Sequence, residues 1–535
     1  MQGGRGGNDG RGRVEWYHPG EVVLVARVPR DRAARSDDLH ALVHGILGDQ
    51  ARRLIAGHET TRSFAFDAPG EDRSLVFLFH KLANVDSPRA VKDAVESVYQ
   101  QTNGQGAEID VIAAMPHIHM RAHEGFSGAS PGSLPRPVYR DKLPPTSTRH
   151  AYRPVNPRFD LASGADAVDA VRVAVLDTMP DLAQAQARAE RLGNEQLRET
   201  VEWLQRQGPA DPRYDQERRE LDQHHAAQAS LAASEQRTPY RVADHGLFVA
   251  GLIHGIAPRA EITLEPVLDD LGVGDLSLLL LGLQRVLARK QPAEPQIVNL
   301  SLGFLPHPAR LPAAWFGLPR PNDAGYVYAE DLYDPTHDRR WVAANRDAVR
   351  RTVDLLDVGL RELGRFLALN NCLVVAAAGN DSLDEVAAHQ ARMEPRLPAR
   401  FETVLGVAAT TSDPRQPARY SNLGDERELG DHVATFGGNA TDSLEPQDAV
   451  IGLYSGEFPE GRPNETGWAY WSGTSFATAL VSGIAANLWA TRGATQPGLQ
   501  AAAVLADLHD EASQHGPYVS ALRTPSIEVR GGWSS

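Results

Sequence analysis

A serine at the start of a long apolar segment is the first candidate for chemistry in this sequence. Gly473-Thr474-Ser475 predicts a short turn, and the small and apolar residues of 476–489 that follow it predict a buried helix. At the start of such a helix, free backbone N–H groups and the positive end of the helix dipole stabilise a developing negative charge. Ser475 is therefore a candidate nucleophile, and the alternative is an ordinary core helix with a serine near its N-cap.

A nucleophilic serine needs a general base, a carboxylate that orients the base, and a hydrogen-bond donor for the oxyanion. Polar residues elsewhere in the chain supply all three. Asp177 and Asn380 each follow an apolar strand, and His245 opens a run of small and apolar residues. The order along the chain is Asp177, His245, Asn380 and Ser475, and each residue stands at the end of a predicted strand or the start of a predicted helix.

The sequence around these four residues resembles the motifs of the subtilisin-like serine proteases, the subtilases of peptidase family S8. The resemblance extends over about residues 165 to 500, and the four motifs occur in the family's order. The matching segments are Val175-Leu176-Asp177-Thr178, His245-Gly246 with Val249-Ala250-Gly251, Ala376-Ala377-Ala378-Gly379-Asn380 and Gly473-Thr474-Ser475-Phe476-Ala477-Thr478.

The resemblance implies a role for each matching residue. Asp177, His245 and Ser475 would form the catalytic triad, and the Asn380 side chain would donate to the oxyanion. A strand that ends at Ser301-Leu302-Gly303 resembles the segment that lines the substrate in this family. The implied substrate-binding residues are Ser301, Leu302, Gly303, Ala378 and Gly379.

Beside three of the motifs, the sequence departs from the family pattern. Met179 stands in place of a glycine, Leu247 and Phe248 replace Thr-His, and Ala479 replaces a proline. None of these changes removes a reacting group, so the sequence predicts a serine endopeptidase that works through an acyl-enzyme. Insertions near the cleft favour a processing or regulatory protease with restricted substrates. A catalytically inactive subtilase-fold module that binds peptides is the alternative.

The elements that must position these residues predict an α/β fold. Continuous apolar strands alternate with helical stretches such as 276–289 and 346–369, a pattern typical of a parallel sheet covered on both faces. Together with the resemblance, this pattern predicts a subtilisin-like three-layer domain with a mainly parallel sheet, preceded by a small α+β module. The predicted strands of the sheet are 171–176, 261–268, 297–302, 373–378 and 404–409.

Composition and periodicity divide the chain into five segments. They are a disordered Gly- and Arg-rich tail (1–13), an α+β module (14–125), a linker (126–156), the protease domain (157–507) and a C-terminal tail (508–535) with one strand at 526–530. The protease domain carries insertions at about 181–240, predicted to be helical, and at about 304–345. Because the second insertion follows Gly303, we expect it to cover the cleft.

The N-terminal module is predicted to hold strands at 21–28, 74–80 and 108–114, with helices at 37–56 and 87–99. This order resembles the pro-domains that cover the cleft of many subtilases and are later cut away. We therefore expect the module to restrain the active site until self-cleavage or a regulatory partner protein releases it. The alternative is a permanent accessory domain that lies away from the cleft.

Composition excludes several other classes of function. The net charge of −15, from 54 Lys and Arg against 69 Asp and Glu, argues against nucleic acid and anionic membranes as partners. The N-terminal residues lack the apolar core of a signal peptide, and no apolar run has the length of a membrane span. The single cysteine, Cys372, allows no intrachain disulfide and is expected to be a buried, inert thiol. A cytoplasmic enzyme that acts on proteins or peptides is expected.

Histidine pairs are the only candidates for a metal site. His117 and His119 would lie on one side of an extended chain, but no carboxylate or cysteine stands beside them in the sequence. We therefore expect both, like His224-His225, to face solvent, and we predict no metal ligands. No cofactor is required for the predicted hydrolysis. The resemblance leaves structural calcium open, because calcium is common in the family, but no residue spacing here identifies the loop that would bind it.

Overall fold

The computed structural model describes most of the protease domain and the strands of the N-terminal module. The tail 1–13, the predicted helix 37–56 except Leu39, His224-His225 and most of the insertion 304–345 lie outside the described residues. The described residues are 17–33, 39, 62–82, 94–97, 99–100, 109–121, 134–144, 149–159, 171–207, 211–219, 241–291, 294–304, 310–312, 326–328, 357–382, 392–423, 432–439, 449–496, 498–519 and 524–534.

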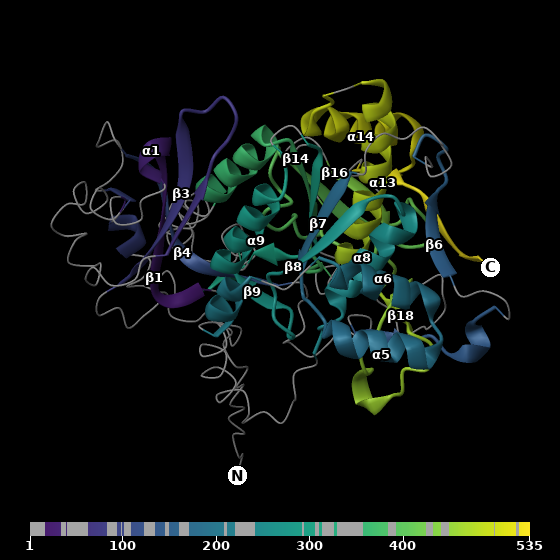
Figure 1. The fold of residues 1–535 in the computed structure, drawn as a ribbon. Helices are drawn as coiled ribbons and strands as arrows, with labels where there is room; N and C mark the ends of the chain where they lie inside the picture. The colour runs from purple at the N-terminus through teal and green to yellow at the C-terminus, as the bar shows by residue number, and fades with distance from the viewer. Residues whose placement is uncertain are drawn as a thin grey trace, which may run out of the picture.

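A large sheet runs through the centre of the protease domain (Figure 1). Its strand order is β19-β20-β16-β15-β14-β10-β7-β8, and all neighbours are parallel except β19 and β20. The five predicted strands are confirmed, with ends that differ by at most two residues. Their bounds are β7 Arg172–Asp177, β8 Glu261–Pro266, β10 Gln296–Leu300, β14 Cys372–Ala377 and β15 Val404–Thr410, and the others are β16 His432–Phe436, β19 Tyr518–Val519 and β20 Thr524–Ile527.

Alternate residues of the central strands enter two separate hydrophobic cores. Val175 belongs to a core that contains residues of α8 (His245–Ile256) and α13 (Thr474–Thr495), whereas Leu176 belongs to a core with residues of α9 (Leu276–Ala288). Because successive side chains of a strand point to opposite faces, helices must cover both faces of the sheet. The predicted three-layer α/β fold is confirmed.

The strand order brings the ends of separate strands together at one edge of the sheet. The chain passes from β7 through α8 to β8 on one side, and β10 and β14 then extend the sheet on the other side of β7. Ligands of open α/β sheets bind where the order reverses in this way, outside the carboxyl ends of the strands. Asp177 ends β7, Ser301 follows β10, and Asn380 follows β14 at this edge.

The N-terminal module contributes four strands to a second sheet with the order β11-β4-β1-β3-β2, in which β9 also pairs with β4. The three predicted strands are confirmed, but the first begins four residues earlier than predicted, and the last extends to Arg121 because the protease domain supplies β9 and β11 as partners for its end. The bounds are β1 Tyr17–Pro29, β2 Ser63–Phe66, β3 Arg73–Lys81, β4 Asp110–Arg121, β9 Val273–Asp275 and β11 Gly303–Phe304.

The module packs on two helices of the protease domain, to the left of the central sheet in Figure 1. One hydrophobic core joins Leu24 of β1 to residues of α9 and of the helix 357–369, among them Phe366. The fit is close at Gly359, where an added Cβ would lie 2.9 Å from Val25 Cγ2. The module and the protease domain therefore share a core.

Part of the predicted linker is a component of the protease fold. Within 126–156, β5 (Arg136–Pro137) pairs with β18 (Trp468–Trp471), and β6 (Arg149–Pro154) pairs with β21 (Val529–Ser534). The sequence of these strands is rich in Pro and Arg and lacks strand periodicity, so their pairing depends on distant partners.

The C-terminal residues also belong to the fold. The helix α14 (Ala501–His515) continues past residue 507, the predicted end of the protease domain. The predicted strand 526–530 corresponds to the end of β20 and the start of β21. In the described part of the insertion 181–240, the predicted helices are present as α5 (Leu182–Leu192) and α6 (Glu195–Gln205).

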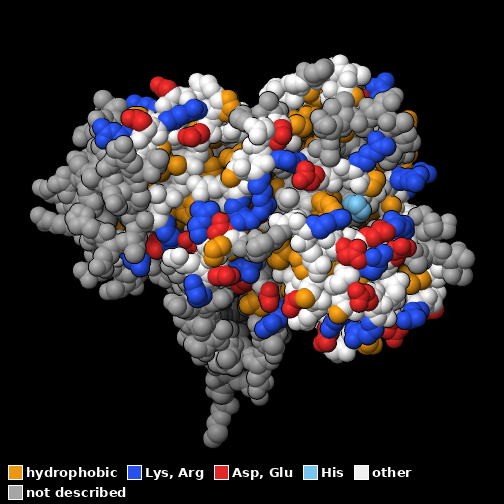
Figure 2. All heavy atoms as spheres, viewed as in Figure 1, with side chains coloured by type: hydrophobic (Ala, Val, Ile, Leu, Met, Phe, Trp, Pro, Cys, Tyr) orange, Lys and Arg blue, Asp and Glu red, His pale blue; other side chains and the backbone are white. Residues whose placement is uncertain are grey.

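Acidic and basic side chains are interspersed across the face of the molecule shown in Figure 2. Among the described residues, no helix has the length and apolar character that crossing a membrane would require.

Cys372 begins β14 and is buried, as predicted. Burial raises the pKa of its thiol to about 12. Because the thiolate is the reactive form, we expect an aromatic disulfide reagent at pH 8 to leave Cys372 unmodified in the native protein and to modify it after denaturation. Rapid release of one equivalent of chromophore from the native protein would contradict this placement.

Candidate active site

Asp177 lies at the end of β7 and is fully buried. One of its oxygens, Oδ1, accepts a hydrogen bond of 2.7 Å from the Thr178 backbone N–H. The Thr178 hydroxyl in turn accepts a 3.0 Å bond from the N–H of Gly246 at the start of α8. This approach requires glycine, because a Cβ at Gly246 would lie 2.2 Å from the Thr178 carbonyl oxygen. The end of β7 and the start of α8 are therefore held in contact.

His245, the first residue of α8, faces the Asp177 carboxylate. Its Nδ1 lies 2.8 Å from Oδ1 and 3.0 Å from Oδ2 of Asp177. The imidazole packs between aromatic rings, with its centroid 5.4 Å from the ring of Trp471 and 5.4 Å from that of Phe476. Because a carboxylate accepts from Nδ1–H, the lone pair of a neutral ring lies on Nε2, where a general base needs it.

Ser475 lies in the first turn of α13, next to the residue whose ring contacts His245. Its hydroxyl donates a 3.1 Å hydrogen bond to the Ser301 carbonyl oxygen, and Ser301 Oγ lies 2.9 Å from the Ser475 carbonyl oxygen. These contacts join the end of β10 to the start of α13. The predicted nucleophile and the predicted substrate segment 301–303 are thereby adjacent.

The Asn380 side chain has a fixed orientation beside the same helix. Its Oδ1 accepts hydrogen bonds of 3.0 Å from the Thr474 N–H and 2.9 Å from the Thr474 hydroxyl. The Thr474 hydroxyl also accepts a 3.2 Å bond from the Gly379 N–H. Because Oδ1 faces Thr474, the donor group of the amide, Nδ2, points away from Thr474. A Cβ built on Gly473 would lie 3.8 Å from this Nδ2.

The other predicted substrate-binding residues lie on neighbouring segments. Leu302 and Ala378 are buried, and Gly303 and Gly379 both lie against the side chain of Arg396. Gly379 has a φ of 105°, which favours glycine, and a Cβ there would lie 2.6 Å from the Asn422 amide. The structure thus brings the segments 301–303 and 378–379 together at one edge of the sheet.

Arg396 is a functional-site neighbour that the sequence analysis missed. Its Nε donates to Asp381 at 2.8 Å, and its Nη1 donates to the Phe304 carbonyl oxygen at 3.0 Å. The buried guanidinium therefore ties the segment after Gly303 to the segment after Asn380. A single Arg in a Pro-rich stretch gives no sequence signal for this contact.

The packing of Phe248 accounts for one departure from the family pattern. The ring is fully buried and packs on Phe476 with centroids 4.5 Å apart and on Trp471 with centroids 5.6 Å apart. Gly452 leaves room for it, because a Cβ there would lie 2.6 Å from Phe248 Cε1. Phe248 thus takes part in an aromatic cluster behind the His245 imidazole.

Asp244, directly before His245, is a second residue that the sequence analysis missed. Its buried carboxylate accepts hydrogen bonds from the backbone N–H groups of Ser455 and Gly456 and from the Ser455 hydroxyl. Burial raises the pKa of this carboxyl group, and the three donors oppose that shift. The signal that could have identified Asp244 in the sequence is an acidic residue directly before an apolar run.

We expect Asp244→Ala to lower the free energy of unfolding by about 1–3 kcal/mol, because both backbone N–H groups bond to the same oxygen, Oδ2, and alanine would leave them without an acceptor. Denaturant titration of the two proteins measures the change. An unchanged midpoint with an unchanged m-value would show that the loop 455–456 does not depend on this carboxylate.

Both histidines of the predicted solvent-facing pair are buried, so that prediction is wrong for His117 and His119. The end of β4 on which they lie is covered by β1 and by β9 of the protease domain. No carboxylate stands near these histidines in the sequence, but the fold brings the carboxylate of Asp275 to His117. Among the described residues, His18, His117 and Asp275 form a group whose ligand atoms all lie within 4.8 Å of one another.

Comparison with known proteins adds a family match. A sequence model described as "Subtilase family" (Peptidase_S8) matches residues 169–516. None of the curated proteins matches the chain.

Several solved structures are similar at low identity. The epidermin leader peptide processing serine protease from Staphylococcus aureus, solved as a mutant, is 12% identical over 95% of this chain and 97% of that chain, with a TM-score of 0.42. A lanthipeptide protease is 16% identical over 67% of this chain and 85% of that chain, with a TM-score of 0.37. A cold adapted subtilisin-like serine proteinase is 17% identical over 69% of this chain and 96% of that chain, with a TM-score of 0.35.

Proposed function

Because this chain belongs to the subtilase family of serine endopeptidases, we propose that Asp177, His245 and Ser475 are its catalytic triad. The observation that carries the proposal is the 2.8 Å contact between His245 Nδ1 and the Asp177 carboxylate, next to the first turn of α13. A buried carboxylate in this position fixes the imidazole tautomer and stabilises the imidazolium that forms during the reaction.

In the proposed mechanism, His245 Nε2 takes the proton of Ser475 Oγ as that oxygen attacks the peptide carbonyl carbon. His245 then gives the proton to the leaving amine, and water hydrolyses the acyl-enzyme by the same steps. The Ser475 hydroxyl, which now donates to the Ser301 carbonyl oxygen, must rotate toward His245. Such hydrogen bonds often align only once substrate is bound.

We propose Asn380 Nδ2 and the Ser475 backbone N–H as the oxyanion donors. The support for Asn380 is the pair of bonds from Thr474 to Oδ1, which fixes the amide before substrate arrives. The support for Ser475 is its place in the first turn of a helix, where backbone N–H groups have no intrahelical partner. A donor held in advance stabilises the developing charge without reorganisation.

We expect Ser475→Ala and His245→Ala each to lower kcat by about 10⁶-fold, because members of a triad act as one unit. Asp177→Asn should lower kcat by about 10⁴-fold and Asn380→Ala by about 10²–10³-fold with little change in KM. Hydrolysis of a fluorogenic peptide library measures these losses, and thermal unfolding serves as the control for folding. Appreciable turnover by Ser475→Ala would rule out Ser475 as the nucleophile.

We further propose that the enzyme is a cytoplasmic processing or regulatory protease with few protein or peptide substrates, and that it needs no cofactor for hydrolysis. The support is the single cysteine, which is buried, and the two insertions in the sequence, one after Asp177 and one after Gly303. A catalytically inactive peptide-binding module is the second candidate, favoured by the altered neighbours Met179, Leu247 and Phe248. Peptide hydrolysis by the wild-type chain separates the two.

We propose that the N-terminal module restrains the active site. The support is the position of β4, whose end pairs with β9 on one side and β11 on the other. Gly303, assigned to substrate binding by the family resemblance, is paired with Arg121 of β4. An extended substrate that adds a strand at this position would need the same backbone groups. Release of β4 by self-cleavage or by a partner protein would therefore open the site.

We expect Gly359→Leu to raise the rate of peptide hydrolysis, because the added side chain would collide with Val25 and weaken the contact between the module and the protease domain. Overpacking of this kind costs about 1–3 kcal/mol. Hydrogen exchange in β1 and β4 reports the loosening. Gly493→Leu is the matched control, because an added Cβ on this helical glycine meets nothing within 4 Å.

Faster exchange in β1 and β4 of Gly359→Leu together with unchanged hydrolysis would contradict restraint by the module. That result would identify the module as an accessory domain whose release does not affect the cleft.

A further inference from the structure

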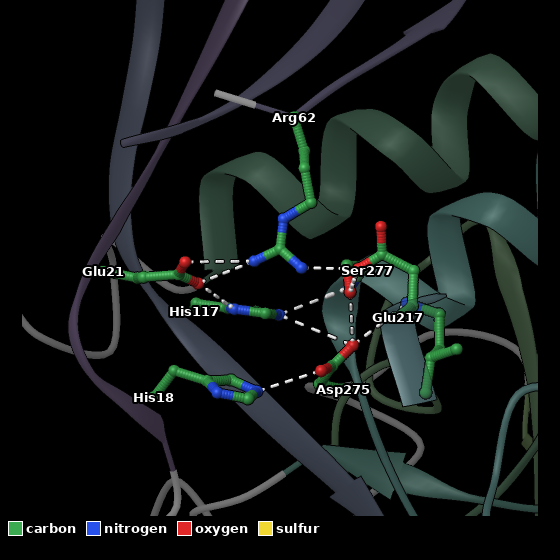
Figure 3. Close-up of polar contacts among 8 residues, drawn as sticks. His18, Glu21, Arg62, His117, Glu217, Asp275 and Ser277 are labelled. Carbon is green, nitrogen blue, oxygen red and sulfur yellow. Dashed lines mark hydrogen bonds and ion pairs between the residues drawn. The ribbon is translucent and has the colours of Figure 1, made fainter. Parts of the chain in front are cut away.

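A buried polar cluster lies where the N-terminal module meets the protease domain (Figure 3). The module supplies His18 and Glu21 from β1, Arg62 before β2 and His117 from β4, while the protease domain supplies Glu217, Asp275 and Ser277. The catalytic mechanism proposed above uses none of these residues.

Two imidazoles face one carboxylate in this cluster. His18 Nε2 lies 2.9 Å from Asp275 Oδ2, and His117 Nε2 lies 3.5 Å from Asp275 Oδ1. The two rings stack with centroids 4.1 Å apart, and Figure 3 shows both directed toward Asp275. All three ligand atoms lie within 4.8 Å of one another, a separation that one ion at about 2.0–2.2 Å from each nitrogen and oxygen can span after a small tilt of the rings.

We propose that His18, His117 and Asp275 bind a divalent transition metal of the zinc class at the junction of the module and the protease domain. Imidazole nitrogen and carboxylate oxygen are ligands that zinc accepts, and two histidines with one carboxylate leave a fourth position for water. The ion replaces the hydrogen bond between His18 Nε2 and Asp275.

The residues around His117 have the arrangement expected behind a metal ligand. His117 Nδ1 lies 2.7 Å from Glu21 Oε2, so a proton on Nδ1 donates to the carboxylate and Nε2 keeps its lone pair. Glu21 is held in turn by Arg62, whose Nη2 donates to Oε2 at 2.9 Å. A carboxylate behind the ring fixes the tautomer and raises the basicity of the ligating nitrogen.

Charge in the cluster also favours a cation. The cluster contains three carboxylates, those of Glu21, Glu217 and Asp275, but one guanidinium, that of Arg62, which donates to both glutamates. Asp275 and Glu217 are buried, and an uncompensated buried charge is costly. With neutral histidines, a divalent ion brings the sum of these formal charges to zero.

The proposed site would hold the module on the protease domain. His18 and His117 belong to two strands of the module, whereas Asp275 ends β9 and caps α9 through a 3.0 Å bond from the Leu278 N–H. A ligand that binds only the docked arrangement stabilises it by mass action. Metal removal would therefore loosen β4, whether or not the chain hydrolyses peptides.

The experiment uses the full chain with Ser475→Ala, so that its outcome is independent of the proposed hydrolysis. After treatment with a chelator and dialysis, zinc is titrated calorimetrically, and Co²⁺ is added separately to record its visible absorption. One zinc ion per chain is expected, with slower hydrogen exchange in β4 once zinc is bound. Glu21→Gln should weaken binding by about 10–100-fold, as loss of a partner behind a ligand does.

His18→Phe tests the ligand directly, because it keeps a ring against His117 and removes the nitrogen. Asp275→Asn is the second variant, since asparagine still caps a helix but is a poor ligand. Both should lose the bound zinc and the Co²⁺ spectrum. His119→Phe is the matched control: its ring lies 4.6 Å from that of His18, it is buried, and it is outside the group of three ligands.

Two results would overturn the proposal. In the first, the chelator-treated chain takes up no zinc at a free concentration of about 100 µM, a level that would saturate even a micromolar site. In the second, His18→Phe and Asp275→Asn bind zinc as tightly as the parent chain. Either result would leave the cluster as a hydrogen-bonded network without a metal.

Discussion

The contact between Asp177 and His245 depends on how closely the end of β7 approaches the start of α8. Thr178 and Gly246 set that approach, since the Thr178 hydroxyl accepts from the Gly246 N–H and a side chain on Gly246 would collide with the Thr178 carbonyl. The helix that carries His245 packs on α13, whose first turn carries Ser475. A shift of α8 would therefore separate the imidazole from the carboxylate and from the proposed nucleophile together.

Residues that stand at the ends of apolar elements could be predicted from the sequence. Asp177, Asn380 and Ser475 each follow or begin a strongly apolar segment, so local patterning and the family's motifs both point to them. The three layers follow from the same alternation of apolar strands and helices. The proposed roles of these residues in catalysis follow from the family's motifs together with the contact between Asp177 and His245.

Features that depend on distant pairing could not be predicted. The strand β6 has no apolar alternation, and its partner β21 lies at the other end of the chain. The absence of a nearby carboxylate in the sequence predicts that His117 and His119 face solvent, yet both are buried, and the pairing of β9 with β4 brings the Asp275 carboxylate to His117. Local patterns carry no information about which edges of two sheets will meet.

The strand β4 links the proposed regulation to the proposed chemistry. It lies between β9 and β11, so one segment of the module contacts both the proposed metal ligand Asp275 and the substrate segment that ends at Gly303. The module also shares a hydrophobic core with α9 and the helix 357–369. Separation of the module would expose apolar surface, which favours a docked module until another event releases it.

The central claim is that Ser475 is an activated nucleophile. Labelling of the native wild-type chain with a fluorophosphonate, followed by peptide mapping, tests it most directly. The account predicts a single modified residue, Ser475, with labelling lost in Ser475→Ala and strongly reduced in His245→Ala. Modification of another serine, or equal labelling of the wild-type chain and Ser475→Ala, would contradict it.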